Sequence, residues 1–282
     1  MRLCLSLFLA TLLLGFPLAG AKAGFLDDLF APKVESWAAW ERFDPASETR
    51  VDHQAWTGFL AGYVHPGADG VHRFAYDKVK AVDRAALESY LTALEQVAVT
   101  TLNRDEQLAY WINFYNALTV KVVLDHYPVA SILDIDISPG FFADGPWDAK
   151  LVTVEGVELS LNDIEHRILR PVWKDPRVHY TINCASIGCP NLQAFAFTGE
   201  KIDALLDAMA VAFINHPRGA RVEKGNLILS SIYSWFAEDF GGEEGVLAHL
   251  RVYAGPQLKE VLDRAGTVGG YAYDWSLNGT GA

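Results

Sequence analysis

Cysteine is scarce in this chain, since only Cys4, Cys184 and Cys189 occur among its 282 residues. So few cysteines exclude a fold held together by several disulfides. Basic residues are also few, with 23 Lys and Arg against 35 Asp and Glu, and they form no cluster. An acidic chain of this kind argues against a nucleic-acid partner and against electrostatic docking on anionic lipid. A glycine-rich phosphate loop is missing too, and we predict no cofactor.

Long apolar runs are confined to the N-terminus, and no later run reaches the roughly 18 residues that a membrane span needs. Residues 3–14 are apolar, Arg2 precedes them, and residues 21–23 read Ala-Lys-Ala. This order is typical of a secretory signal peptide cleaved before Gly24. Cleavage would remove Cys4 and change the formal charge from −12 to −14. We therefore expect a soluble periplasmic or secreted protein without a membrane anchor after processing.

The apolar patterning predicts a helix-rich domain. Hydrophobic residues make up 51% of the chain, and the longest amphipathic pattern is NRDEQLAYWINFYNALTVKVVLDHYP at residues 103–128. Further helices are predicted at residues 83–99, 160–171, 202–213 and 232–242, hairpins at 150–160 and 220–231, and a strand at 175–184. Helices with a few strands in hairpins indicate the α+β class, as a single domain with a small, mostly antiparallel sheet.

Three polar residues interrupt the apolar helix predicted at residues 103–128. Asn103 is its expected N-cap, and Glu106 completes a variant of the capping box. Glu106, Asn113 and Asn116 lie within about 80° of one another on a helical wheel. A buried amide without a partner costs about 1–3 kcal/mol, so these side chains need partners. They either bond to the backbone of a neighbouring loop or line a binding cleft.

The segment RVHYTINCASIGCPNL, residues 177–192, carries both remaining cysteines. In an exported chain, two cysteines favour a disulfide between Cys184 and Cys189. The alternative is a reactive thiol, which needs an imidazole within hydrogen-bonding distance. A zinc site with both cysteines and His166 or His179 is a third arrangement. It lacks a second ligand pair at short spacing, and we predict no metal.

The partner of a reactive thiol is left open by the spacing. His179 and Cys184 are five residues apart, so a regular strand would point them to opposite faces. His179 could serve Cys189 across the loop, or His166 could serve Cys184. Either pair would need Glu165, Asp239 or an asparagine to orient the imidazole, as in a catalytic triad. Glu165 and His166 are adjacent on a predicted helix, so their side chains diverge by about 100°. His179, Thr181 and Asn183 share one face of the predicted strand, and this polar row favours a cleft.

Five separated blocks resemble one known family. The blocks are NRDEQLAYWINFYNALTV, LSLNDIEHRILRP, RVHYTINCASIGCPNL, SIYSWFAEDFGG and YDWSLN. In this order they resemble the domain of unknown function 547 family, which occurs in bacterial exported proteins and at the C-terminal ends of certain plant proteins. The resemblance covers roughly residues 80–275 and implies no particular activity. The positions that match its motifs are Glu106, Asn113, Asn116, Glu165, His166, His179, Cys184, Cys189 and Asp239.

A more distant likeness concerns the papain-like and transglutaminase-like thiol enzymes, which also follow a central helix with a strand that carries a histidine. In those enzymes the nucleophilic cysteine begins the central helix. The corresponding helix here has asparagines and no cysteine. If the architecture is shared, the nucleophile is Cys184 or Cys189, or the ancestral site has been lost.

Together these patterns predict a signal peptide at 1–23, an N-terminal extension at 24–79, the family domain at 80–275 and a short tail at 276–282. One hypothesis is a hydrolase or acyl transferase that acts on a peptide or a cell-envelope component. In it Cys184 attacks, His179 or His166 accepts the proton, and Glu165 or Asp239 orients the imidazole. The other hypothesis is a module with a structural Cys184–Cys189 disulfide that binds a peptide or small molecule in a polar cleft.

Overall fold

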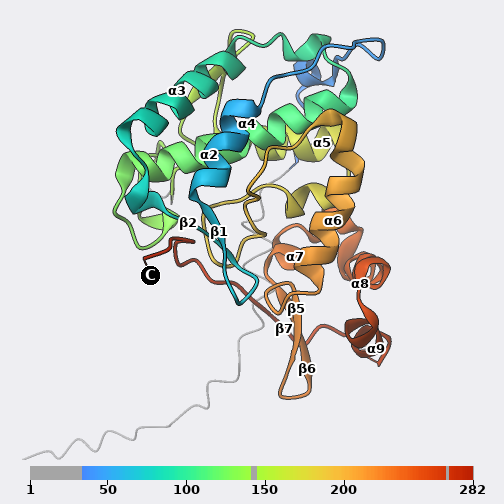
Figure 1. The fold of residues 1–282 in the computed structure, drawn as a ribbon. Coiled ribbons are helices and arrows are strands. Elements are labelled where there is room, and N and C mark those ends of the chain that lie inside the picture. The colour runs from blue at the N-terminus through green and yellow to red at the C-terminus, as the bar shows by residue number, and fades with distance from the viewer. Residues whose placement is uncertain (1–33, 141–144, 265–266, 282) are drawn as a thin grey trace, which may run out of the picture.

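The computed structural model describes residues 34–140, 145–264 and 267–281, and the predicted signal peptide at 1–23 lies outside them. Helices dominate, and the strands form small sheets, so the predicted α+β class is confirmed (Figure 1). The α-helices are α2 (Gln54–Tyr63), α3 (Ala81–Glu95), α4 (Arg104–His126), α5 (Arg170–Trp173), α6 (Ile202–Ile214), α7 (Ile232–Trp235), α8 (Gly242–Tyr253) and α9 (Pro256–Arg264). Within the described ranges, no helix is both long and apolar enough to cross a bilayer.

The strands pair mostly antiparallel. They are β1 (Val64–Pro66), β2 (His72–Phe74), β3 (Val152–Val154), β4 (Val157–Leu159), β5 (Ala220–Glu223), β6 (Asn226–Ser230) and β7 (Gly270–Ala272). The predicted hairpins correspond to β3–β4 and β5–β6, and β7 adds to β6 in parallel. Two turn positions have positive φ, at Gly156 and Gly225, which suits residues without a Cβ.

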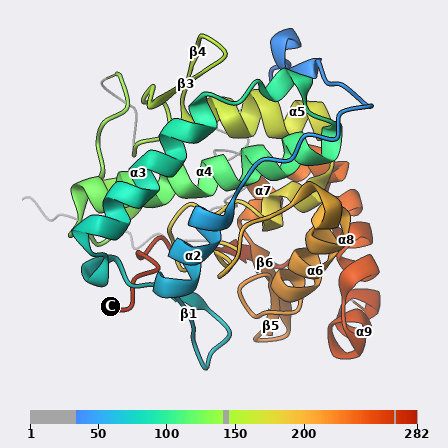
Figure 2. The ribbon, with the colours of Figure 1, turned by 45° about the horizontal axis from the view of Figure 1, so that its top comes forward.

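Helix α4 is central, as its apolar composition predicts. It is buried along most of its length and passes beneath α3 in Figure 2. Asn103 caps it by accepting a hydrogen bond from the Glu106 N–H at 3.0 Å. The Glu106 carboxylate does not complete the expected capping box; it accepts a hydrogen bond from the Val51 N–H at 2.7 Å instead. The N-terminal segment is thus fastened to the start of α4.

Two hydrophobic clusters form the interior. The larger one surrounds α4 and includes side chains from α2, α3 and the segment around Leu161. The smaller one packs α6, α7 and α8 against the sheet of β5, β6 and β7. Each cluster buries large aromatic side chains, such as Trp111 in the first and Tyr233 in the second. A pocket lies where the two clusters meet, with Ile182 of the larger cluster and Ile232 of the smaller one in its lining.

The strand predicted at residues 175–184 is wrong. Residues Pro176–Tyr180 form a 3₁₀ helix (η6) that Asp175 caps by accepting a hydrogen bond from the Arg177 N–H. Proline at the first helical position favours this start because its φ is already helical. The alternation that indicated a strand does not separate two faces, since His179 is 3% exposed and Tyr180 is fully buried.

The helix predicted at 83–99 begins and ends earlier than expected. It runs from Ala81 to Glu95, and its N-cap position is Lys80. Asp83 accepts a hydrogen bond from the Tyr63 hydroxyl. The buried side chains of this helix are Leu87, Tyr90, Leu91 and Leu94.

Candidate active site

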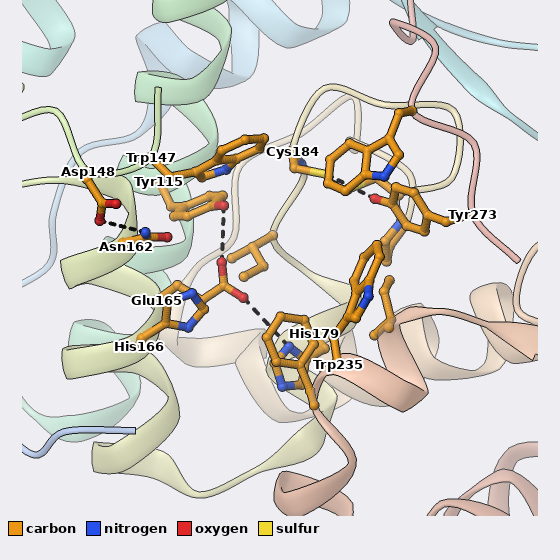
Figure 3. Close-up of a pocket in the computed structure, with 16 residues that line it drawn as sticks. Tyr115, Trp147, Asp148, Asn162, Glu165, His166, His179, Cys184, Trp235 and Tyr273 are labelled. Carbon is orange, nitrogen blue, oxygen red and sulfur yellow. Dashed lines mark hydrogen bonds and ion pairs between the residues drawn. The ribbon is translucent and has the colours of Figure 1, made fainter. Parts of the chain in front are cut away.

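A pocket of about 320 Å³ collects most of the residues that the motifs single out (Figure 3). Glu165 and His166 come from the helix that follows β4, His179 from η6, Asp148 from the loop before β3, and the two cysteines from the loop after η6. Large aromatic side chains from distant parts of the chain complete its walls. The lining residues are Tyr115, Trp147, Asp148, Asn162, Glu165, His166, His179, Ile182, Cys184, Cys189, Pro190, Ile232, Trp235, Phe236, Tyr273 and Trp275.

Glu165 and His166 lie on an unusual helix. Residues Asp163–Leu169 form a π-helix (η5), in which the Arg170 N–H donates to the Glu165 carbonyl five residues earlier. The segment begins with Ser160 and Asp163 bonded to each other, an arrangement typical of a helix start. π-Helical turns are rare and occur frequently at functional sites. Here both Glu165 and His166 line the pocket, although no hydrogen bond joins them among the described residues.

A carboxyl, an imidazole and a carboxylate follow one another at the pocket wall. The His179 Nδ1 atom lies 3.9 Å from Glu165 Oε1, and His179 Nε2 lies 2.7 Å from Asp239 Oδ2. The hydroxyl of Tyr115 donates to Glu165 Oε2 at 3.2 Å. The ring of His179 also stacks on Phe236 with 4.2 Å between centroids. These contacts leave the imidazole a single orientation.

The protonation states of Glu165, His179 and Asp239 suit proton transfer near neutral pH. Burial raises the pKa of Glu165 to about 7. Burial also lowers the pKa of His179 below its ordinary value, although the hydrogen bond to Asp239 opposes that shift. Burial would raise the pKa of Asp239, but hydrogen bonds from His179 and Arg170 lower it overall. At neutral pH Asp239 is therefore ionised, the His179 imidazole is neutral and the Glu165 carboxyl is partly protonated.

Arg170 is a residue of this site that the motif analysis missed. Its guanidinium donates to both oxygens of Asp239, from Nε at 2.6 Å and from Nη2 at 3.1 Å. Its Nη1 lies 3.1 Å from His166 Nδ1. Burial lowers the pKa of His166 to about 3, and the nearby Arg170 adds to that shift. Arg170 thus fixes Asp239 from behind the pocket and keeps His166 neutral. Its position four residues after His166 was the one available signal.

The two cysteines are free thiols on the pocket wall. Cys184 Sγ lies 3.0 Å from the Tyr273 hydroxyl and 3.3 Å from Ser186 Oγ, and the Cys184 N–H donates to Cys189 Sγ at 2.9 Å. Burial and the neighbouring sulfur raise the pKa of Cys184. Burial would raise the pKa of Cys189, but hydrogen bonds from Cys184 and Tyr273 lower it to about 7. Oxidation of the pair to a disulfide stays a prediction.

The expected contact between a sulfur and an imidazole is not formed. In the described part of the chain, no hydrogen bond joins Cys184 or Cys189 to His179 or His166. Both nitrogens of His179 face carboxyl groups instead. In Figure 3, Cys184 and Tyr273 lie on one side of the pocket, and Glu165 and His166 on the other. Likewise, no group of three or more His, Cys, Asp or Glu within the described residues could hold a metal ion.

The cysteine loop is held by residues that the sequence did not indicate. Arg218 donates to the carbonyls of Ile187 and Cys189 at 2.8 and 2.7 Å. The C-terminal segment lies along the same loop, where the Gly188 N–H donates to the Asp274 carbonyl at 2.7 Å. A Cβ at Gly188 would lie 2.8 Å from the Asp274 nitrogen, so only glycine permits this approach. The approach brings Tyr273 and Trp275 to the pocket.

Glu106, Asn113 and Asn116 do not line this pocket, and the structure corrects the expected position. Asn113 exchanges two hydrogen bonds with the backbone of Phe197, at 2.8 and 2.9 Å. Asn116 donates to the Thr181 carbonyl and accepts from the Asn183 N–H, both at 2.8 Å. The alternative in which these amides bond to neighbouring loop backbone is therefore confirmed. Asn116 supports the site indirectly, because Thr181 and Asn183 connect η6 to the cysteine loop.

The polar row expected at His179, Thr181 and Asn183 is also corrected. Only His179 of the three lines the pocket. The Thr181 hydroxyl donates to the Val178 carbonyl, and the Asn183 amide donates to the Pro190 carbonyl at 2.7 Å. Both side chains thus close turns of their own segment.

Comparison with known proteins gives one match. The family model described as "Protein of unknown function, DUF547" matches residues 99–214. The matched range contains Glu165, His166, His179 and both pocket cysteines, while Asp239 and the aromatic residues of the C-terminal segment follow it. No curated protein and no solved structure matches the chain. The papain-like and transglutaminase-like likeness thus has no support from these comparisons.

Proposed function

We propose that this chain, whose residues 99–214 match the DUF547 family model, is a hydrolase or acyl transferase that works by proton transfer. The pocket is its active site. The observation that carries this proposal is the buried Glu165 carboxyl beside His179, with His179 bonded in turn to Asp239. A perturbed acid and a neutral base in one pocket, with an orienting carboxylate bonded to the base, are the components of general acid–base catalysis.

Each group has a role that follows from its environment. His179 donates its Nε2–H to Asp239, so its Nδ1 lone pair is the basic site that faces Glu165 and the pocket. Nδ1 takes a proton from an attacking water while Glu165 gives its proton to the leaving atom. Asp239 stabilises the imidazolium that forms. The proton then passes from Nδ1 to the Glu165 carboxylate, which restores both groups.

The nucleophile is the part of the proposal that differs from the sequence hypothesis. A thiol attack by Cys184 would need a base near its sulfur, and its hydrogen-bond partners are Tyr273 and Ser186. Its raised pKa keeps the thiol protonated at neutral pH. We therefore assign the attack to water, with Cys184 as an element of the opposite wall. Cys189 has a pKa lowered to about 7, so both thiols are tested. Cys184→Ser and Cys189→Ser variants separate the mechanisms, since both retain turnover only when water attacks.

The experiment is a substrate panel of nitrophenyl esters, peptide amides and nitrophenyl glycosides with the full chain and matched variants. Glu165→Gln and His179→Asn should each lower turnover by about 10²- to 10⁴-fold, the usual contribution of a positioned acid or base. Glu158→Gln, an exposed glutamate of β4, is the control and should leave turnover unchanged. Turnover that survives both pocket substitutions would refute the proposal.

A second candidate function is a binding module, which the aromatic walls of the pocket favour. Trp147, Trp235, Phe236, Tyr273 and Trp275 line it, and such side chains supply large rigid contact areas. A ligand that binds tightly and is released unchanged, both from the unmodified protein and from Glu165→Gln, would support this candidate.

Export also stays a prediction. It requires the mature protein to begin at Gly24, which mass spectrometry of the secreted protein measures.

A further inference from the structure

One wall of the pocket is a continuous group of aromatic side chains. The rings of Trp235 and Trp275 stack with centroids 5.6 Å apart, and Tyr273 lies 4.7 Å from Trp275 and 4.8 Å from Trp235. Trp147 meets the edge of Trp275 at 5.9 Å. All four side chains are only partly buried, so part of their ring surface remains available to a ligand. Flat apolar surfaces of this kind bind the C–H faces of rings.

The facing wall offers hydrogen-bonding groups in a fixed arrangement. The Asn162 amide donates to Asp148 Oδ1 at 2.7 Å, and the backbone of each residue is held by a further hydrogen bond. Among the described residues, no protein donor is bonded to Asn162 Oδ1 or to Asp148 Oδ2. These two oxygens and the second amide hydrogen present acceptors and a donor side by side. Figure 3 shows the pair beside Glu165, across the pocket from Tyr273 and Trp235.

The charge of the pocket narrows the class of ligand. No Lys or Arg is among its described lining residues, whereas Asp148 and Glu165 are. An anionic ligand, such as a phosphorylated or carboxylated molecule, would meet no opposite charge. A ligand with many neutral hydroxyls would use both walls at once, since hydroxyls donate and accept. The volume of about 320 Å³ suits a small ligand or the end of a larger one.

We propose that this pocket binds a neutral saccharide, with a pyranose ring on Trp235 and Trp275 and its hydroxyls on Asp148 and Asn162. This inference rests on the proposed function and names its substrate class, an acyl ester on one hydroxyl of the saccharide. Glycoside hydrolysis would need an acid and a base on opposite sides of the sugar, whereas Glu165 and His179 lie 3.9 Å apart. Water adds to the ester carbonyl and gives a proton to His179. The acyl C–O bond then breaks as Glu165 gives its proton to the sugar oxygen, which releases the acid and the free sugar hydroxyl.

The test measures binding by calorimetry with the full chain and three neutral probes: chitotriose, cellotriose and maltotriose. At least one should bind. Its affinity should fall about tenfold or more in Trp275→Ala, the loss of one good aromatic contact. Asn162→Ala should weaken binding similarly. Because Asn162 is partly exposed, this variant should fold, and it tests the site even if Trp275→Ala does not fold. Trp37→Ala removes an equally partly buried tryptophan outside the pocket and should leave binding unchanged.

The outcomes separate this inference from the proposed function. Binding of none of the three probes, or binding that Trp275→Ala and Asn162→Ala leave intact, overturns the saccharide site. So does binding of tetramethylammonium in their place, which would indicate a cage for an organic cation. Ester or amide turnover that depends on Glu165, without sugar binding, overturns the saccharide site alone. Sugar binding through Trp275 and Asn162 without release of acetic acid from the acetylated form of that sugar supports the site and overturns the hydrolase.

Discussion

At the scale of single residues, the protonation states of Glu165 and His179 predict how activity depends on pH. Turnover needs a protonated Glu165 and a neutral His179. It should therefore fall as pH rises through about 7, the pKa to which burial raises Glu165. On the acid side it should persist below the ordinary histidine range, because burial lowers the pKa of His179.

The measurement is kcat/KM against pH for whichever substrate the panel identifies. Glu165→Gln should remove the alkaline limb together with most of the rate. Glu158→Gln should keep the profile of the unmodified protein. Rates that keep rising above neutral pH would show that Glu165 does not act as the acid.

Arg170 is predicted to act through Asp239, as a positioning residue. Arg170→Lys keeps a positive charge but cannot hold both Asp239 oxygens at once. We expect kcat to fall between about tenfold and 10²-fold, which is less than for loss of the base itself. The pKa of His179, followed by NMR of its ring protons, should shift in the same variant. An unchanged His179 titration with full activity would show that Arg170 has a structural role only.

Residues of the site differ in how well the sequence predicts them. Ionisable residues are rare in apolar segments, so Glu165, His166 and His179 can be recognised in the sequence as candidates. The structure places all three at the pocket. Tyr115 and Tyr273 could not be identified, because an aromatic residue in an apolar segment has the same pattern whether it fills a core or borders a cavity. Only their positions relative to the cleft distinguish the two cases.

At the scale of elements, Asn116 joins α4 to the segment between η6 and the cysteine loop. Asn116→Ala would leave the Thr181 carbonyl and the Asn183 N–H without their partner in a buried place. The free energy of unfolding, measured in urea, should fall by about 1–3 kcal/mol. The control Gln257→Ala removes an exposed amide from α9 and should change it by less than about 0.5 kcal/mol. Equal effects in the two variants would contradict this role of Asn116.

Two elements have conformations that the apolar periodicity of the sequence does not predict. The helix predicted at 160–171 is present, but its π-helical form over Asp163–Leu169 depends on a shift of one residue in hydrogen bonding. No residue pattern specifies that shift, which tertiary contacts such as those of Arg170 stabilise. The strand predicted at 175–184 failed for a related reason. Its polar residues, as well as its apolar ones, are buried and satisfied by hydrogen bonds.

At the scale of the whole molecule, buried histidines should make the protein sensitive to mild acid. Burial lowers the pKa of His53 and His249 to about 4 and that of His166 to about 3. These rings are neutral in the folded state, whereas an unfolded chain protonates them below about 6.5. Their contribution to stability is complete above about 6.5 and is lost as the pH falls toward their folded pKa values.

Glu165 has the opposite sign, because its raised pKa favours the folded state below about 4.5 and this contribution is lost as pH rises through about 7. These three histidines, together with His179 and its lowered pKa, act against this one carboxyl. The net free energy of unfolding should therefore be lower at about pH 5 than at about pH 7.5. Urea unfolding at the two values checks this, and His53→Gln should reduce the difference. A protein more stable at the lower pH would contradict the assignment.

The α+β class, the central helix α4 and the two hairpins could be predicted from residue order, because these depend on local periodicity, capping and turn residues. Residue order also indicated the segments that carry the acid, the imidazoles and the thiols. Tertiary packing sets which of them meet. It placed Asp239 and Glu165 on the two nitrogens of His179, moved Asn113 and Asn116 to backbone partners, and brought the aromatic C-terminal segment to the pocket. Such hydrogen bonds join residues up to 84 positions apart, and no local pattern records which distant groups will pack together.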